Sequence, residues 1–247
     1  MSAGLQTTPF FEGAFQCVQP VRGYRFSADA LLLSAFVLSG REPGQRFLDV
    51  GAGCGVISLL LAAGGWPRGA ALELQEELVE CCRQTMAANG LAGRVRVEKG
   101  DVRALKGIVE PGSFDAVVSN PPYFPAEAGR LNDSQQEVTA RHEVACTMDD
   151  VLSAARFALP EGGRLFVTYP AVRLSDLFAL LPRHKLKACR LRCVHPLPGR
   201  EASSVLVEAV KSRPRDLVVE APLYAHRESG GYAEWFDELR CAVVARV

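Results

Sequence analysis

The sequence has no long hydrophobic run, and this limits the class of protein. None of its apolar stretches approaches the ~20 residues that a membrane-spanning helix needs. The opening residues, MSAGLQTTPFFEGAF, lack a basic start followed by an apolar segment, so we expect no secretory signal. Because 48% of the 247 residues are hydrophobic, we expect a folded cytoplasmic protein with one large core.

Metal-binding spacings are also missing. The eight cysteines include no CxxC pair, and the four histidines form no HxxxH or HExxH pattern. We therefore predict no metal site and reduced, mostly buried thiols.

There is no internal repeat, low-complexity segment or clear linker, which predicts a single domain. Residues 1–45 are then an N-terminal extension with one helix, 46–211 the core of the domain and 212–247 a C-terminal tail.

The net charge is zero, but the charges are unevenly distributed. Residues 1–150 carry 13 basic and 18 acidic side chains, and residues 151–247 carry 15 basic and 10 acidic ones. A polyanionic partner is therefore expected to dock on the C-terminal part of the chain. The sequence leaves open whether the protein is a monomer or a homodimer.

Strand and helix patterns alternate along most of the chain. Because strands that alternate with helices form βαβ units, the sequence predicts an α/β fold with a mostly parallel sheet and helices on both faces. The connection between residues 195 and 203 is too short for a helix, so the last two strands form an antiparallel C-terminal hairpin. The seven predicted strands are 46–50, 69–74, 94–101, 114–119, 164–169, 185–195 and 203–210, and the predicted helices are 28–38, 55–63, 75–90, 147–159 and 173–181.

A glycine-rich turn, LDVGAGCG, joins the first core strand to a helix. Such a turn lets a ligand approach the backbone closely. Its glycines are Gly51, Gly53 and Gly55, whereas the dinucleotide fingerprint has the spacing G-x-G-x-x-G. This difference disfavours an NAD-dependent oxidoreductase and suits a ligand with an amino acid moiety.

Acidic residues stand at the ends of three successive predicted strands. Ligands of open α/β sheets bind at these carboxyl ends. Glu73 is placed to accept hydrogen bonds from both hydroxyls of a ribose, and Asp101, with the adjacent Val102, lies where an adenine ring is expected. Asp49 is expected close to an ammonium group. Each acid alone also fits a helix cap, but together they predict a nucleoside-like ligand.

The fourth strand ends in the tetrapeptide Asn120-Pro121-Pro122-Tyr123. Two consecutive prolines remove two backbone donors and fix two φ angles, which makes this turn rigid. With the glycine turn and the strand-end acids, it resembles the Rossmann-type S-adenosylmethionine-dependent methyltransferases that act on a planar amide or exocyclic amine nitrogen. The resemblance covers about residues 20–210 and implies a Rossmann-like fold, S-adenosylmethionine as cofactor and N-methylation as the reaction.

The resemblance implies a catalytic role for this tetrapeptide. An exocyclic adenine amine is a poor nucleophile, because its lone pair is delocalised into the ring. The Asn120 side-chain oxygen and the Pro121 carbonyl are expected to accept its two N–H bonds and so stabilise the transition state. Pro122 holds this geometry, Tyr123 stacks on the extruded base, and Asn120 also borders the cofactor.

Three groups of enzymes share these motifs. Protein glutamine methyltransferases usually carry a helical domain before the glycine turn, and ribosomal guanine-N2 methyltransferases often have a duplicated domain. Only about 45 residues precede the turn here, so we expect neither arrangement. Four further segments resemble the bacterial valine-tRNA adenine-N6 methyltransferases: 22–36, 140–152, 169–177 and 222–240. This resemblance implies methylation of an adenine next to the tRNA anticodon. The alternatives are another amine or amide nitrogen on rRNA or protein, and a non-catalytic nucleotide-binding module.

Two regions are candidates for contact with RNA. The connection 124–146 is long enough to be a substrate-gating loop rather than a plain surface insertion. A basic run at 183–192 contains no acid, and it predicts either phosphate contacts or the charged guard of an edge strand. The predicted RNA-binding residues are Arg25, Arg141, His142, Lys185, Lys187, Arg190 and Arg192.

Overall fold

One mixed sheet forms the centre of the fold. The computed structural model describes residues 4–22, 25–40, 44–121, 146–213 and 215–246. Five strands run parallel: β3 (Arg46–Val50), β4 (Arg68–Glu73), β5 (Val95–Lys99), β6 (Ala116–Ser119) and β7 (Arg164–Pro170). The hairpin strands β8 (Leu186–His195) and β9 (Ser204–Lys211) follow, and β9 is antiparallel to both β7 and β8.

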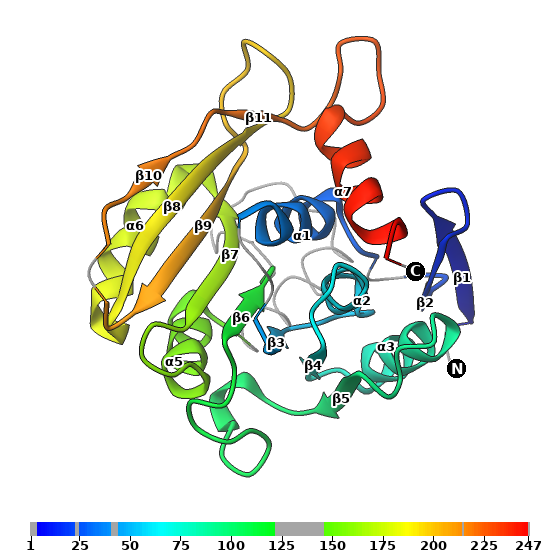
Figure 1. Ribbon diagram of the computed structural model, residues 1–247, viewed down its shortest axis with the longest axis horizontal. Helices are drawn as coiled ribbons and strands as arrows, with labels where there is room; N and C mark the ends of the chain where they lie inside the picture. Colours follow the sequence, from blue (N-terminus) through cyan, green and yellow to red (C-terminus); the bar gives the residue numbers. More distant parts are fainter. Residues whose placement is uncertain (1–3, 23–24, 41–43, 122–145, 214, 247) are drawn as a thin grey trace.

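The strand order confirms the predicted sheet and extends it. Among the described residues the order is β5-β4-β3-β6-β7-β9-β8 (Figure 1). Two short strands, β10 (Val218–Val219) and β11 (Leu223–Tyr224), pair with the outer edge of β8. They belong to the segment predicted as a tail. The seven predicted strands agree with the observed ones to within two residues at each end, because their apolar patterns are continuous.

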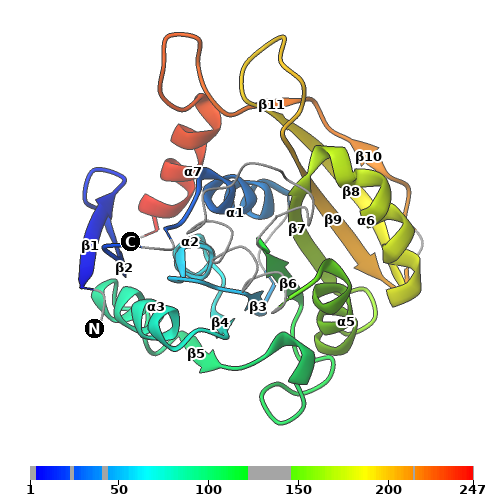
Figure 2. The same cartoon turned by 180° about the vertical axis from the view of Figure 1, so that it is seen from behind.

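Helices cover both faces of the sheet. One face carries α1 (Ala28–Gly40), α2 (Val56–Ala63), α3 (Glu76–Ala88) and α7 (Glu234–Val244), and the other carries α5 (Met148–Ala158) and α6 (Leu174–Leu180) (Figures 1 and 2). Side chains along β3 alternate between the two cores: Phe47 faces α2, and Leu48 faces α5. Strands buried on both faces must be apolar throughout, which is the pattern that the sequence shows. None of the described helices has the length and apolar character to cross a bilayer.

Three short 3₁₀ turns connect these elements. They are η1 (Val102–Ala104), η2 (Ala171–Arg173) and η3 (Leu181–His184). The turn η1 follows β5 directly and packs beside α5. No long helix therefore covers this part of the sheet within the described residues between β5 and β6, which leaves space along α5.

The N-terminal extension contains a hairpin that the sequence patterns did not predict. Strands β1 (Leu5–Phe10) and β2 (Phe15–Pro20) pair with each other, separate from the main sheet. The hairpin is anchored on α3, where the Val18 N–H donates to Thr85 Oγ1 at 3.0 Å. Its turn brings aromatic rings to the end of the chain, with Phe11 and Phe236 centroids 5.0 Å apart. The tail also forms a helix, α7, which packs against α1.

Candidate active site

The glycine turn between β3 and α2 forms the floor of the site. Gly51, Gly53 and Gly55 all have positive φ angles, of 72°, 56° and 84°, which glycine adopts without steric cost. A Cβ added to Gly51 would meet no atom within 4 Å, whereas one on Gly55 would lie 2.6 Å from Cys82 Sγ. The first glycine therefore leaves open space for a ligand, and the last lets α2 pack closely on α3.

Glu73, the last residue of β4, holds this turn in shape. Its side chain is largely buried; Oε2 accepts a hydrogen bond from Gly53 N at 2.9 Å. Oε1 accepts from the backbone N–H groups of Leu74 and Gln75 at 2.8 and 2.9 Å. A carboxylate has roughly four acceptor positions. Three of them are used by the protein, and the hydrogen bonds from a ribose to Glu73 stay a prediction.

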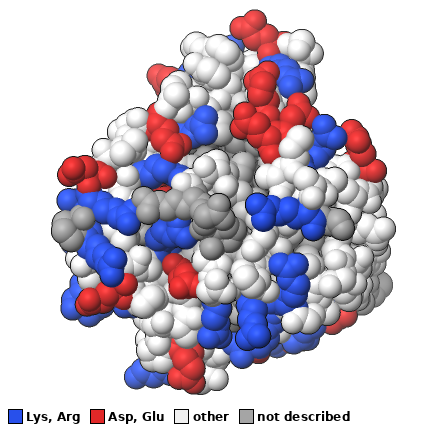
Figure 3. Space-filling view, in the orientation of Figure 1, with Lys and Arg blue, Asp and Glu red and all other residues white. Residues whose placement is uncertain are grey.

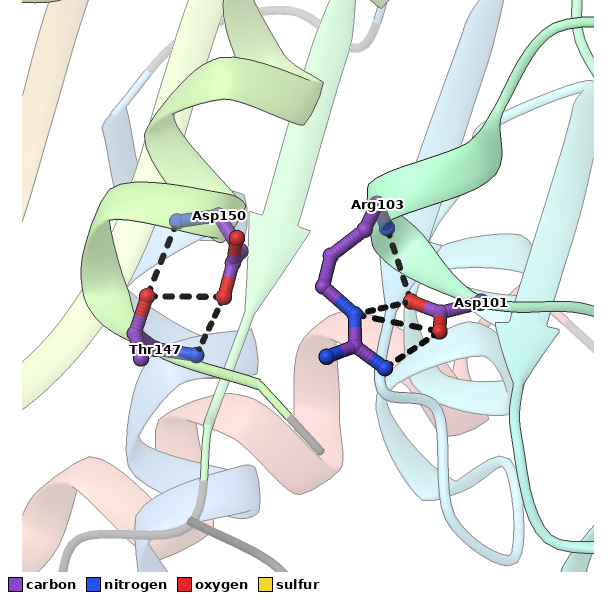
Figure 4. Close-up of polar contacts among 4 residues, drawn as sticks. All are labelled: Asp101, Arg103, Thr147 and Asp150. Atoms are coloured by element: carbon purple, nitrogen blue, oxygen red, sulfur yellow. Dashed lines mark hydrogen bonds and ion pairs between the residues drawn. The ribbon is translucent and has the colours of Figure 1, made fainter. Parts of the chain in front are cut away.

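Asp101 follows β5 and is engaged by a basic side chain. The Arg103 guanidinium donates to both carboxylate oxygens, with Nη2 2.6 Å from Oδ2, and the Arg103 N–H donates to Oδ1 at 2.9 Å (Figure 4). Hydrogen bonding from Arg103 lowers the pKa of Asp101. Thr147 and Asp150, which form the capping box of α5, lie on the other side of Arg103 (Figure 4). An adenine ring that bonds to Asp101 must therefore exchange with Arg103.

Asn120 lies beside the glycine turn because the ends of β3 and β6 are bonded together. The buried Ser119 hydroxyl donates to the Val50 carbonyl at 2.8 Å, which fixes the last residue of β6. Asn120 then lines a small cavity together with Gly51. Its carboxamide makes no hydrogen bond with any of the described residues. Pro121 is buried behind it.

The sequence analysis did not single out the other residues that line this cavity. Phe26, just before α1, and Ala30, in its first turn, close the cavity together with Ala52, Cys54, Val56 and Ile57. The Phe26 ring is supported by Phe10 of the hairpin, with centroids 6.1 Å apart. An aromatic residue just before a helix is also a common way of fixing the entering chain, so the pattern did not single it out. Arg25, predicted to contact RNA, is exposed next to Phe26.

Asp49 of β3 is bonded to the helix that follows the glycine turn. Its side chain is wholly buried and bonds to Ser58 of α2, and Asp49 is not among the residues that line the cavity. Oδ2 accepts hydrogen bonds from the Ser58 N–H at 3.1 Å and from the Ser58 hydroxyl at 2.8 Å. Burial raises the pKa of Asp49 to about 7. Asp49 therefore ties the first turn of α2 to the sheet through Oδ2, and its role beside an ammonium group stays a prediction.

The basic run 183–192 does not form one exposed surface, because the Arg190 side chain is largely buried. The Arg190 side chain is 11% exposed, lies 3.8 Å from the centre of the Phe36 ring and pairs with Glu208 and Glu220 at 3.5 and 3.3 Å. Arg192 donates to the Ala221 carbonyl at 3.1 Å. The predicted phosphate contact from Arg190 is therefore wrong, since acidic side chains already neutralise its buried guanidinium.

Other predicted residues are placed as follows. Lys185 and Lys187 are exposed, and Lys185 precedes β8 in a left-handed conformation with φ of 58°. Val102 begins η1 directly after Asp101. Four predicted site residues lie outside the described residues, together with most of the connection 124–146: Pro122, Tyr123, Arg141 and His142.

The family of the chain follows from comparison with known proteins. The profile described as methyltransferase small domain matches residues 27–175, which include the glycine turn, Glu73, Asp101 and Asn120. The chain belongs to this family. The protein is thus an S-adenosylmethionine-dependent methyltransferase, and its sheet has the Rossmann-like form that the sequence predicts.

Curated relatives match this methyltransferase over most of their length. The chain is 31% identical to the tRNA1(Val) (adenine(37)-N6)-methyltransferase of Porphyromonas gingivalis over 87% of this chain and 86% of the relative. It is 32% identical to the protein of the same name from Phocaeicola vulgatus, over 74% and 75% of the two chains.

Solved structures agree on the fold. A protein described as a predicted O-methyltransferase from Agrobacterium tumefaciens superposes with a TM-score of 0.67 at 23% identity, over 87% of this chain and 96% of that one. TrmN from Thermus thermophilus has a TM-score of 0.52 at 25% identity, over 74% of this chain and 48% of that one.

The geometry of this methyltransferase fits its cofactor. Gly51 leaves open space above the turn, and the Glu73 and Asp101 carboxylates stand at neighbouring strand ends on the same edge of the sheet. Parallel strands place such groups together at their carboxyl ends, where ligands of these folds bind. A nucleoside with an attached amino acid moiety matches this combination of acceptors and exposed backbone.

Proposed function

We propose that this methyltransferase modifies the N6 nitrogen of an adenine next to the anticodon of a tRNA. The observation that carries the proposal is the position of Asn120, which stands at the end of β6 and lines the cavity beside the open glycine turn. The names of the curated relatives support the same substrate class. Because tRNA is the substrate, we place the protein in the cytoplasm.

The residues of the chain have separate roles in this reaction. We assign Gly51, Glu73 and Asp101, with the adjacent Val102, to cofactor binding. When bound, S-adenosylmethionine supplies a methyl group attached to a positively charged sulfur. The Asn120 oxygen and the Pro121 carbonyl accept the two N–H bonds of the adenine amine. This interaction strengthens as the nitrogen lone pair localises, so it stabilises the transition state more than the ground state.

The rigidity of the acceptor pair is part of the proposed mechanism. Ser119 is fully buried and bonded to β3, and Pro121 is also buried, so the backbone on both sides of Asn120 is fixed. Fixed dipoles need no reorganisation during the reaction, which is why they are effective in catalysis. A planar amide nitrogen on a protein, or the amine of a guanine, would present the same pair of donors. The acceptor pair therefore defines the chemistry, and the polymer must be identified by experiment.

The test is methyl transfer from tritiated S-adenosylmethionine to three substrates: tRNA, rRNA and protein from cells lacking the enzyme. Digestion of the labelled tRNA to nucleosides should give N6-methyladenosine, and mapping should place it next to the anticodon. Label in N2-methylguanosine of rRNA, or in methylglutamine of a protein, would replace this proposal with one of the alternatives. Heat-denatured enzyme gives the background.

A further inference from the structure

Basic side chains from three separated segments meet at the edge of the sheet opposite the active site. Lys185 and Lys211 are neighbours there, because β8 and β9 pair Leu186 with Lys211. The Arg213 side chain lies over Gly162, and Gly162 N–H donates to the Lys211 carbonyl. We call this surface the amino-edge patch; its members are Arg156, Arg183, Lys185, Lys187, Lys211 and Arg213.

The patch carries charge that the protein leaves largely uncompensated. Among the described residues, none of its six side chains forms an ion pair, and all except Lys211 are exposed. Lys211 donates to the carbonyls of Arg156 and Leu159 at 2.6 Å, and so anchors β9 to the end of α5. Figure 3 views this edge of the sheet, and Lys and Arg side chains gather at its left over the ends of β8 and β9.

A groove runs along α5 from the Arg103 side chain beside the active site to Phe157, the sequence neighbour of Arg156 of the amino-edge patch. It has a volume of about 510 Å³ and lies between η1 and α5. Arg103 and Lys106 form one wall, and Asp150, Ser153 and Phe157 are on the other. Positions 150, 153 and 157 share one face of a helix, so the groove follows α5 for about 10 Å at 1.5 Å per residue.

The two ends of the groove have different chemistry. One end is beside the Asp101–Arg103 pair of the active site (Figure 4), and the other reaches Phe157, next to Arg156 of the patch. Lys106 adds an exposed positive charge between them. A nucleotide-sized group fits a groove of this volume. Exposed basic side chains along such a path match the repeated phosphates of a nucleic acid backbone.

We propose that the η1–α5 groove and the amino-edge patch bind the sugar-phosphate backbone of the RNA substrate, away from the base that is methylated. This inference rests on the proposed function, because it takes RNA as the substrate. It also moves the main backbone contacts away from Arg190, whose guanidinium is buried against Glu208 and Glu220, and from Arg192, which bonds to the Ala221 carbonyl. The new surface is built from α5, η3 and the strands β8 and β9. Such contacts position the RNA without reading its sequence.

The test replaces Lys187 and Arg213 with Gln in one variant. Both side chains are exposed and make no hydrogen bond or ion pair with a described residue, so the fold should be retained. The control is the double variant Arg68→Gln and Arg83→Gln, which removes the same charge from the start of β4 and from α3. The dissociation constant for tRNA is measured over a series of salt concentrations, with S-adenosylmethionine affinity as a check on the fold.

The Lys187/Arg213 variant should bind tRNA about tenfold more weakly, and the slope of log K against log salt should fall by about 0.7–0.9 per lost phosphate contact. The control should behave as wild type. Equal slopes in the wild type and both variants, or equal losses in the two variants, would overturn the proposal. So would binding to phosphatidylserine vesicles that depends on these two residues while tRNA affinity is unchanged. Failure of the proposed function is distinguishable, because the wild type would then form no N6-methyladenosine in tRNA.

Discussion

Glu73 is expected to contribute both to the stability of the fold and to cofactor affinity, so one substitution of this residue tests both contributions. In the structure its carboxylate accepts three backbone hydrogen bonds, from Gly53, Leu74 and Gln75. The Gly53 N–H belongs to the glycine turn between β3 and α2, so this hydrogen bond fixes the conformation of the turn on which the cofactor is expected to bind. We predict that Glu73→Ala lowers the free energy of unfolding as well as the affinity for S-adenosylmethionine.

The magnitude follows from the surroundings of each donor. The Gly53 bond is buried and charge-assisted, and its loss costs about 1.5–3 kcal/mol. Leu74 and Gln75 are exposed and their bonds to Glu73 are only partly buried, so water can replace the carboxylate there and each bond contributes about 0.5–1 kcal/mol. The expected loss of stability is therefore roughly 2.5–5 kcal/mol. The dissociation constant for the cofactor should rise at least on the order of tenfold, through the lost ribose contact.

Urea unfolding and isothermal calorimetry measure the two effects on the same protein. Glu76→Ala is a matched control, because Glu76 is an exposed acid three residues further on that pairs with Lys99 at the surface. This control should change stability and cofactor affinity little. A Glu73→Ala variant as stable as wild type would refute the role assigned to the three hydrogen bonds. Lower stability with unchanged affinity would confine Glu73 to shaping the turn.

Two further predictions concern residues beside the same turn. Asn120→Ala should leave cofactor affinity nearly intact but lower the single-turnover rate about 100-fold or more, as for the loss of a transition-state contact; a near-normal rate would show that the turn is only structural. The pKa of Asp49 is raised by burial from its ordinary value of 3.8 to about 7, so the native state keeps a proton that the unfolded state loses. Its contribution to stability is present below pH 4 and lost as the pH rises towards 7, by up to about 4 kcal/mol. Urea unfolding at a series of pH values should show this decline in wild type and a flatter profile in Asp49→Asn, and parallel profiles would contradict it.

The order of elements and the chemistry of the turns were predictable from the sequence. The periodic patterns of strands and helices depend only on neighbouring residues. The antiparallel pairing of β8 and β9 was predictable because only seven residues separate the two predicted strands. The glycine spacing and the Asn-Pro-Pro-Tyr tetrapeptide are likewise local. Their place at strand ends was enough to put Gly51, Glu73, Asp101 and Asn120 on one edge of the sheet, since parallel strands share that edge.

The N-terminal segment shows where local patterns stop being informative. The hairpin β1–β2 is held by side chains of α3, more than sixty residues away, such as Thr85 and Asn89. A short hairpin alone is marginally stable, so its formation depends on this packing. Phe26 reaches the cavity because Phe10 of that hairpin supports its ring. Neither contact has a signal in the sequence of either segment.

The sequence by itself determined that strands end in Glu73, Asp101 and Asn120. The hydrophobic pattern of a strand and the composition of the turn after it depend only on residues close together along the chain. Only the tertiary structure decided which way the charged side chains face. A register shift between Ala188 and Arg190 accompanies the burial of Arg190 against Glu208 and Glu220, while Lys185 and Lys187 remain exposed with Arg156 and Arg213. Strand register and the partners across it are set by segments far apart in the chain, so a basic run that is continuous in sequence is divided in space.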